Sequence, residues 1–281
     1  MNMKLSIITI NFNNLEGLKK TAESVINQTW KEFEWIIIDG GSTDGSKEYI
    51  VKLNDDLTRN GWNPIAYWCS EPDKGIYNAM NKGIVRAKGE YLNFMNSGDC
   101  FASEETLTGV FDKERKADIL YGYVTNRVIN GEFHHSSLMK QVVCWYDLFL
   151  YTIPHQGAFI RKTMFTIVGL YEEKCKIVAD WKWFVVAILI HKASYEFIPY
   201  KIAVMQEVGI SSTTASLLER QQQMKGIFPS YISEDDAHNL TILSIIQSTK
   251  FTRFLFKIVK ITAFQIHFIR KKREIRHQTP Q

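Results

Sequence analysis

Short apolar runs alternate with stretches of helical periodicity along the first hundred residues. Residues 5–10 and 33–38 are largely apolar and rich in β-branched side chains, which is typical of strands buried on both faces of a parallel sheet. Between them, apolar residues recur at helical spacing over 15–28 and predict a helix with one buried face. A strand, a helix and a second strand in this order predict a right-handed βαβ unit. The pattern therefore indicates an α/β fold.

Polar residues and glycines follow each predicted strand of this region. They lie at 11–14, 39–45, 71–75 and 96–99. Because ligands bind beyond the carboxyl ends of the strands in open α/β sheets, we expect these four segments to form one binding rim. Segment 39–45 alone is equally compatible with a plain turn before a helix, so the prediction depends on the coincidence of all four.

Several residues of the rim suit a phosphorylated ligand. Asp39 offers a carboxylate that can accept a hydrogen bond from a base or a ribose hydroxyl. Asp73 and Lys74 precede a predicted helix that starts at Ile76, where free N–H groups attract an anion, although a solvated helix entry is the alternative. Oxygen ligands for a divalent cation come from 96–99. The chain has no GxGxxG or GxxxxGK(S/T) segment, so the dinucleotide-binding and P-loop classes lack their phosphate signatures.

Four motifs in this order and spacing resemble the family 2 glycosyltransferases, which are inverting enzymes with the GT-A fold. The motifs are residues 6–13, 38–45, 70–83 and 96–99. The resemblance implies a Rossmann-like GT-A domain with a mixed, mostly parallel central sheet flanked by helices. The third motif looks most like that of bacterial members that build exopolysaccharide, capsule or lipopolysaccharide.

The resemblance also implies roles for individual residues. Thr9 and Phe12 would line the nucleobase pocket. Asp39 would contact the base or the ribose, and Asp73 would close over the nucleoside. The residues implied in binding the nucleotide sugar are Thr9, Phe12, Asp39, Asp73, Lys74 and Asn96.

The turn 96–99 occupies the place of the family's DXD metal motif but departs from it. Asn96 and Gly98 stand where the earlier acids would be, so Asp99 is the only carboxylate of the turn. The resemblance then implies that Mg²⁺ or Mn²⁺ is held by Asp99, the donor diphosphate and water, an arrangement compatible with weak binding.

Two segments of the second half carry candidate residues for the second substrate. His155 and Gln156 precede an apolar strand, where they would bind the acceptor or the leaving diphosphate; a structural histidine is an equal alternative. Asp180 lies near the start of an apolar helix, at the place where family members carry their acidic base. A plain N-cap aspartate is the alternative there. Trp181 follows Asp180 and is grouped with the acceptor or diphosphate residues.

Basic residues gather at the C-terminal end of the chain. The whole chain has a formal charge of +4, yet nine lysines and arginines against one glutamate lie from Lys250 onward. On a helical wheel over 250–271, a narrow basic sector adjoins a broad apolar one, which predicts a helix in a membrane interface near anionic lipid. A helix packed on the domain is the alternative, and nucleic acid is not an expected partner.

Cysteine usage and hydropathy bear on the compartment. The cysteines are widely spaced and form no CxxC pair, so we expect reduced thiols at Cys69, Cys100, Cys144 and Cys175. The N-terminal apolar run is too short for a signal peptide, and no run reaches the roughly 18 apolar residues of a spanning helix. These patterns predict a cytoplasmic protein that lies peripherally on the inner face of the cytoplasmic membrane.

The chain is thus predicted to contain a GT-A domain at 1–215 and a basic, amphipathic helical extension at 216–281. Within the domain, 1–100 would bind the nucleotide sugar and 101–215 the acceptor. The hypothesis is an inverting hexosyl- or N-acetylhexosaminyltransferase that moves a sugar from a nucleoside diphosphate sugar to a hydroxyl of a glycan or lipid-linked acceptor. Asp180 would remove the acceptor's proton, and Asp99 with its metal would neutralise the charge of the leaving group.

Two other classes of function are alternatives. A nucleotidyltransferase that makes activated sugars also needs a nucleotide-binding sheet and a metal carboxylate. It normally carries a Gly-rich, basic loop near the first strand, and 11–17 has neither a glycine run nor an arginine. A non-catalytic, membrane-docked nucleotide-sugar-binding protein is compatible with the loss of acids at Asn96 and Gly98.

Overall fold

The structure is a computed structural model that describes residues 3–127, 133–136, 148, 152–205, 219, 220, 222 and 223. Its strands are β1 (Leu5–Asn11), β2 (Phe33–Asp39), β3 (Ile65–Ser70), β4 (Tyr91–Phe94), β5 (Cys100–Phe101), β6 (Ile119–Arg127), β7 (Phe133–Ser136), β8 (Ala158–Arg161) and β9 (Tyr195–Met205). Its α-helices are α1 (Leu15–Ile26), α2 (Ser46–Arg59), α3 (Ile76–Arg86), α4 (Thr106–Phe111), α6 (Lys162–Val168) and α7 (Ala179–Val185). A 3₁₀ turn, η1 (His155–Gly157), and a π-helical turn, η2 (Val186–Ile190), complete the described elements.

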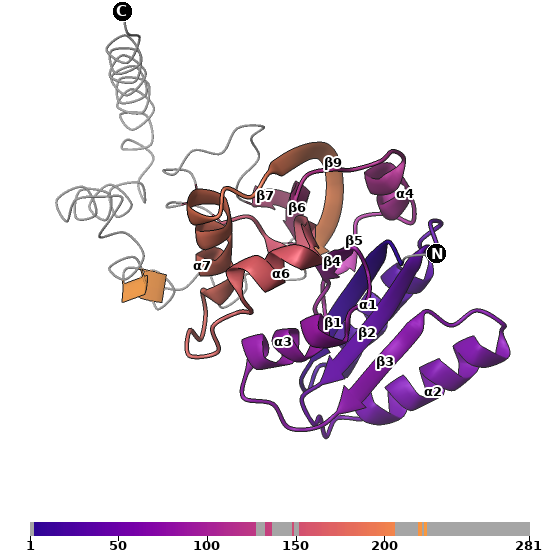
Figure 1. Ribbon diagram of the computed structural model, residues 1–281. Coiled ribbons are helices and arrows are strands. Elements are labelled where there is room, and N and C mark those ends of the chain that lie inside the picture. The colour runs from indigo at the N-terminus through magenta and orange to yellow at the C-terminus, as the bar shows by residue number, and fades with distance from the viewer. Residues whose placement is uncertain are drawn as a thin grey trace, which may run out of the picture. The chain divides into compact units, whose positions relative to one another are not determined.

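The described strands form one mixed sheet in the order β3-β2-β1-β4-β8-β6-β9-β5, with β7 paired to β6. In Figure 1 the indigo and violet strands β1, β2 and β3 lie side by side. They are parallel, and β4 joins β1 on its other side, also in parallel. β8 then pairs with β4 in the antiparallel sense. The mixed α/β sheet expected from the motifs is therefore confirmed.

The two faces of the parallel strands are covered by different helices. Every residue of β1 and β2 is buried, as the continuous apolar runs predict. Leu5 and Ile7 belong to a core cluster that includes Leu18 of α1 and Ile50 of α2. On the opposite face α3 comes very close to β1, since a Cβ added to Gly83 would lie 2.4 Å from the Ile8 side chain. Both faces of these strands are thus covered by packed side chains, which leaves the strand ends for ligands.

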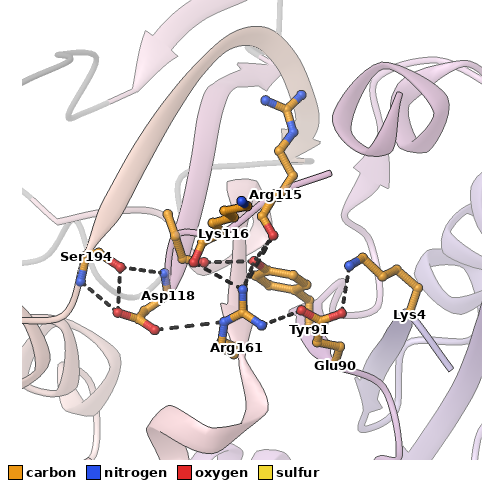
Figure 2. A network of polar contacts seen from close by, with 9 residues as sticks. Lys4, Glu90, Tyr91, Arg115, Lys116, Asp118, Arg161 and Ser194 are labelled. Carbon is orange, nitrogen blue, oxygen red and sulfur yellow. Dashed lines mark hydrogen bonds and ion pairs between the residues drawn. The ribbon is translucent and has the colours of Figure 1, made fainter. Parts of the chain in front are cut away.

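An ion-pair network joins the two halves of the sheet at the beginning of β4. Figure 2 shows the Arg161 guanidinium between Glu90, Tyr91 and Asp118. It donates to the Tyr91 hydroxyl at 2.7 Å and to the Glu90 carboxylate, which Lys4 also contacts at 2.6 Å. Since β4 runs from here toward 96–99, the network lies at the end of the strand opposite the predicted rim and leaves the rim to other residues.

The predicted basic helix over 250–271 lies outside the described residues. Strand β6 pairs with β7 in the antiparallel sense, and 128–132, between them, are not described. The chain divides into a compact unit, Met1–Arg220, and a second unit, Gln221–Gln281.

Two further observations concern the described residues. Cys69 and Cys175 are free thiols, whereas Cys144 is not described. In the described part of the chain, no helix combines the length and the apolar character needed to cross a bilayer.

Candidate active site

Asp39 organises the loop that follows β2. Its Oδ1 accepts from Asn11 Nδ2 at 2.7 Å and from Ser42 Oγ at 2.6 Å. Its Oδ2 accepts from Ser70 Oγ at 2.6 Å and from the Ser42 backbone N–H at 3.0 Å. The side chain is fully buried, and its carboxylate accepts four hydrogen bonds from other groups of the chain. Asp39 therefore ties together the ends of β1, β2 and β3.

These donors also decide the charge of Asp39. Burial alone would raise the pKa of a carboxyl group, but hydrogen bonds from Ser42, Ser70 and Asn11 outweigh burial and hold the pKa of Asp39 below its ordinary value. The group is ionised at neutral pH. In this structure it faces its own loop, and its predicted contact with a base or ribose stays a prediction.

Phe12, Gly40 and Asp73 form a second cluster on the surface of this rim. Phe12 is 66% exposed, an unusual position for a phenyl ring. A Cβ added to Gly40 would lie 2.6 Å from Asp73 Oδ2 and 3.2 Å from the Phe12 ring. The backbone of Gly40 thus lies between the ring of Phe12 and the carboxylate of Asp73. Such a site can stack a flat ring and bind its polar edge.

Two further residues predicted for the nucleotide, Thr9 and Lys74, lie apart from this cluster. Thr9 is fully buried, and its hydroxyl accepts from Trp35 Nε1 at 2.9 Å. Lys74 is exposed, and its backbone N–H donates to Asn78 Oδ1 at 3.1 Å. Thr9 therefore supports the strands below the rim, whereas Lys74 lies in the solvent-exposed loop before α3.

The turn 96–99 is held by Thr21 of α1 and by Asn14, the N-cap of that helix. Thr21 Oγ1 donates to the Asp99 carbonyl at 2.7 Å and accepts from the Gly98 N–H at 3.0 Å. Asn14, the N-cap of α1, donates to the Ser97 carbonyl at 3.1 Å. Helix α1 thereby fixes the turn at the end of β4.

A polar chain runs from this turn to Asp180. Gln156 Nε2 donates to Asp99 Oδ2 at 2.9 Å. Asn96 Nδ2 lies 3.1 Å from His155 Nε2, and His155 Nδ1 lies 3.0 Å from Asp180 Oδ2. Residues from the end of β4, from η1 and from α7 thus meet at one place.

Asp180 is held ionised by its surroundings. Burial would raise the pKa of Asp180, but hydrogen bonding and charge interaction with His155, the Trp181 N–H at 2.8 Å and Tyr77 Oη at 3.0 Å hold it below its ordinary value. Burial and the nearby Asp180 charge raise the pKa of Tyr77, which is therefore a neutral donor. Tyr77 also donates to the Ile177 carbonyl at 2.6 Å.

Glu219 contacts the segment before α7, and Arg220 places a cation near Asp180. The Glu219 carboxylate accepts from the backbone N–H groups of Lys176 at 2.5 Å and Ile177 at 2.9 Å. The Arg220 guanidinium lies 5.5 Å from the centre of the Trp181 ring. Burial lowers the pKa of Arg220, while the charge of Asp180 acts in the opposite direction. The Trp181 indole itself is buried and donates to the Leu148 carbonyl at 2.6 Å.

The rim offers a divalent cation few side-chain ligands of its own. Among the described residues, no group of three or more His, Cys, Asp and Glu side chains could hold a metal ion. The turn 96–99 nevertheless carries the Asp99 carboxylate and the Ser97 hydroxyl, which is buried without a hydrogen-bond partner in the described part of the chain. Oxygen donors of this kind fit Mg²⁺ or Mn²⁺, provided that most ligands come from a bound diphosphate and water.

Sequence reasoning missed three residues of this site. Tyr77 lies within the third motif, and Thr21 lies within the helix predicted over 15–28, but neither was assigned a role of its own. A signal existed for Thr21, because it interrupts the apolar face of α1 between Leu18 and Ala22. Arg220 had no signal, because its neighbour Asp180 lies 40 positions earlier in the chain.

Comparisons with known proteins identify the family and the fold of the chain. The sequence pattern of the family described as Glycosyl transferase family 2 matches residues 6–169. A glycosyltransferase of Mycobacterium tuberculosis is 30% identical over 194 residues, which are 66% of this chain and 69% of that protein. A PGL/p-HBAD biosynthesis glycosyltransferase of Mycobacterium bovis is 30% identical over 63% of this chain and 66% of that protein.

Solved structures show the same fold at lower identity. A fragment of S. aureus TarS has a TM-score of 0.64 at 18% identity, covering 88% of this chain and 73% of the fragment. The chain spans 44% of the longer TarS chain. Mannosyltransferase PcManGT from Pyrobaculum calidifontis has a TM-score of 0.58 at 13% identity, covering 93% of this chain and 80% of its own. The GT-A fold expected from the four motifs is confirmed, and the chain belongs to glycosyl transferase family 2.

Proposed function

We propose that the chain is an inverting glycosyltransferase of cell-surface polysaccharide biosynthesis. It would move a sugar from a nucleoside diphosphate sugar to a hydroxyl of a glycan or lipid-linked acceptor. One observation carries the proposal. Two neighbouring sets of polar contacts lie between the end of β4, where a diphosphate would lie, and an ionised carboxylate on α7; they are Asp99–Gln156 and Asn96–His155–Asp180.

The names of similar proteins support the choice of donor. A TarS fragment was solved with UDP-GlcNAc, and PcManGT was solved with GDP-Man and Mn²⁺. On this basis we place the nucleoside between Phe12 and Asp73, over the backbone of Gly40. The diphosphate would then extend toward Asp99 and Asn96. A hexosyl or N-acetylhexosaminyl group is the expected cargo.

Each end of the site has its own chemistry. A cation bound at Asp99 supplies positive charge that stabilises the leaving diphosphate. Asp180 is the carboxylate on which removal of the acceptor's proton depends. Gln156 keeps the Asp99 carboxylate oriented through its hydrogen bond. Because the acceptor oxygen attacks the anomeric carbon directly, transfer proceeds with inversion and without a covalent enzyme intermediate.

The acceptor and the membrane are proposed on narrower grounds. The Mycobacterium bovis relative is named for PGL/p-HBAD biosynthesis. The basic segment from Lys250 onward favours a cytoplasmic membrane surface with anionic lipid, where a lipid-linked acceptor would lie.

A thermal-shift screen tests the proposed donor class. UDP-GlcNAc, GDP-mannose and related nucleoside diphosphate sugars are each added with and without Mn²⁺. A ligand that binds only the folded protein at about 100 times its Kd stabilises it by about 2.7 kcal/mol, so the matching donor should raise Tm by several degrees. The shift should be larger with Mn²⁺, because a cation held by Asp99 would add attraction to the diphosphate. Free sugars serve as controls. If no nucleotide sugar raises Tm above the value of the protein without ligand, the proposal fails.

Gly40→Ala tests where the nucleoside lies. Gly40 has no strained backbone angle, so alanine is tolerated there. Its methyl group would lie 2.6 Å from Asp73 Oδ2, and this flexible side chain must move away. We expect KM for the donor to rise about tenfold with little change in kcat, because ground-state and transition-state binding are weakened equally.

The matched control for this variant is Gly61→Ala. It adds the same methyl group at a place with no atom within 4 Å. Its positive φ should cost about 1 kcal/mol of stability but leave KM unchanged. If Gly40→Ala binds the donor as tightly as the control does, the nucleoside lies elsewhere.

A further inference from the structure

The Tyr77 hydroxyl lies between two acceptors that compete for its single hydrogen. Its oxygen is 3.0 Å from Asp180 Oδ1 and 2.6 Å from the Ile177 carbonyl oxygen. The side chain is 6% exposed, so water is a poor substitute for either contact. Because a charged acceptor forms the stronger hydrogen bond, the direction of the hydroxyl depends on whether Asp180 is ionised.

Helix α3 carries Tyr77 and connects the donor rim with the segment before α7. The helix directly follows the loop 71–75, which holds Asp73. Asn81, one turn further along α3, donates to the Tyr171 carbonyl at 2.9 Å and accepts from the Tyr171 N–H at 3.0 Å. The helix is thereby fixed against this segment, and Tyr77 is held at a defined distance from Asp180.

Two other donors contact the Asp180 carboxylate. The Trp181 N–H donates to Oδ1 at 2.8 Å, and His155 Nδ1 of η1 lies 3.0 Å from Oδ2. The further titratable groups that sense the charge of Asp180 are Arg220 and Tyr171. Among the described residues, Tyr77 is thus the side-chain donor at Oδ1, and a phenyl ring in its place would leave this oxygen with a backbone donor.

We propose that Tyr77 is a positioning residue of the transfer reaction: it donates to Asp180 Oδ1 while Asp180 is a carboxylate, and to the Ile177 carbonyl once Asp180 has taken the acceptor's proton. This inference rests on the proposed glycosyltransferase function and names a residue that prepares its base. Since the loop with Asp73 leads into the helix of Tyr77, one helix would serve both substrates.

The hydroxyl turns during transfer but keeps its hydrogen. The acceptor O–H bond breaks, and its proton goes to the Asp180 carboxylate. The oxygen's electron pair forms the new bond to the anomeric carbon, while the bond from that carbon to the diphosphate oxygen breaks and its electron pair leaves with the nucleoside diphosphate. The Tyr77 O–H then donates to Ile177, and its oxygen can accept from the new carboxylic acid. Release of the proton to solvent restores the starting state.

Tyr77→Phe tests the proposal, with the titration of Asp180 as the first readout. The protein is labelled with ¹³C at the aspartate Cγ atoms, and the Asp180 signal is identified by its loss in Asp180→Asn. A donor to the charged form lowers the pKa of a carboxyl group, so removing the hydroxyl should raise the pKa of Asp180 by about one to two pH units. This measurement requires no substrate.

Turnover should shift in the same direction. The signal is release of nucleoside diphosphate from UDP-GlcNAc or GDP-mannose, whichever gives the larger thermal shift, with a panel of alkyl glycosides as acceptors. Activity is lost as the pH falls through the pKa of the base, so a raised pKa moves this loss to higher pH. We expect Tyr77→Phe to be several-fold slower than the wild type near about pH 4.5 and within about twofold of it near about pH 8, with KM for the donor unchanged.

Two control variants separate the hydroxyl from packing. Tyr171→Phe removes the same group from a neighbouring ring, whose centroid is 5.6 Å from that of Tyr77 and whose hydroxyl is buried without a hydrogen-bond partner in the described part of the chain. It should leave the pKa of Asp180 and the pH profile unchanged. Asn81→Ala loosens the attachment of α3 to Tyr171, so it should lower Tm but leave the titration of Asp180 in place.

The outcomes are distinct from those of the proposed function. If the pKa of Asp180 is the same in Tyr77→Phe as in the wild type, or rises as much in either control, the inference is overturned whatever the activity. A raised pKa with an unmoved pH profile removes Asp180 from proton transfer and Tyr77 with it. If the wild type releases no nucleoside diphosphate from any donor, the glycosyltransferase proposal itself fails. Donor-induced Tm shifts, measured for each variant, show that the folded site is present.

Discussion

Asp180→Asn lowers the turnover number by about a thousandfold and leaves donor binding intact, as expected for loss of a group on which general base catalysis depends. An amide has one acceptor oxygen, whereas the Asp180 carboxylate meets donors from Trp181, Tyr77 and His155. The uncharged amide keeps the size of the side chain but cannot take the acceptor's proton.

Donor binding should survive because it depends on other elements. Phe12, Gly40 and Asp73 come from the ends of β1, β2 and β3, whereas Asp180 lies on α7. The measurements are kcat by nucleoside diphosphate release, and Tm with and without donor. Asp55→Asn, the same change at an exposed carboxylate on α2, is the control and should match the wild type. Turnover within tenfold of the wild type would remove Asp180 from the mechanism.

Asp39→Asn lowers the free energy of unfolding at pH 7 by about 3 kcal/mol, the cost of leaving charge-assisted hydrogen bonds unmade in a buried site. The carboxylate accepts from Asn11, Ser42 and Ser70 without any exposure to solvent. An amide cannot accept at both ends, so at least one serine donor loses its partner. The loop 39–45 should loosen, and the donor-induced Tm shift should shrink with it.

The pH dependence of this loss follows from the lowered pKa of Asp39. A carboxyl group whose pKa is lower in the folded than in the unfolded protein stabilises the fold above its unfolded pKa of about 3.9, and less as the pH falls through the folded pKa. Urea unfolding between pH 7 and pH 3 should therefore show the largest difference from wild type near neutrality and a smaller one below about pH 4. Asp55→Asn should stay within about 0.5 kcal/mol throughout. A difference that grows on acidification contradicts this account.

The layout of the rim could be predicted because it depends on local patterns. Apolar runs define β1 and β2, and each run ends where polar residues begin, at Asn11 and Asp39. Parallel neighbours bring such ends to one edge regardless of side-chain detail. The meeting of Asp99 with His155, Gln156 and Asp180 was expected only from the family resemblance, since nothing in the local sequence ties η1 to α7.

Side-chain directions could not be predicted in the same way. Thr9 lies in the first motif, yet its hydroxyl serves the Trp35 indole, because a buried indole N–H needs an acceptor and the register of β1 and β2 provides this one. Trp181 follows Asp180 in sequence, but the helical turn directs its ring into the core. Tyr77 reaches Asp180 across more than a hundred residues. Each of these contacts depends on long-range packing that a linear pattern does not contain.

The order of strands in the sheet has a consequence for synthesis. β4 takes β8 as its neighbour, and Arg161 at the end of β8 secures that edge through Glu90 and Tyr91. A growing polypeptide therefore exposes the open edge of β4 until position 161 has left the ribosome. Unpaired edges of this kind attract other strands. The nascent N-terminal half should consequently be the stage at which this protein most needs a chaperone.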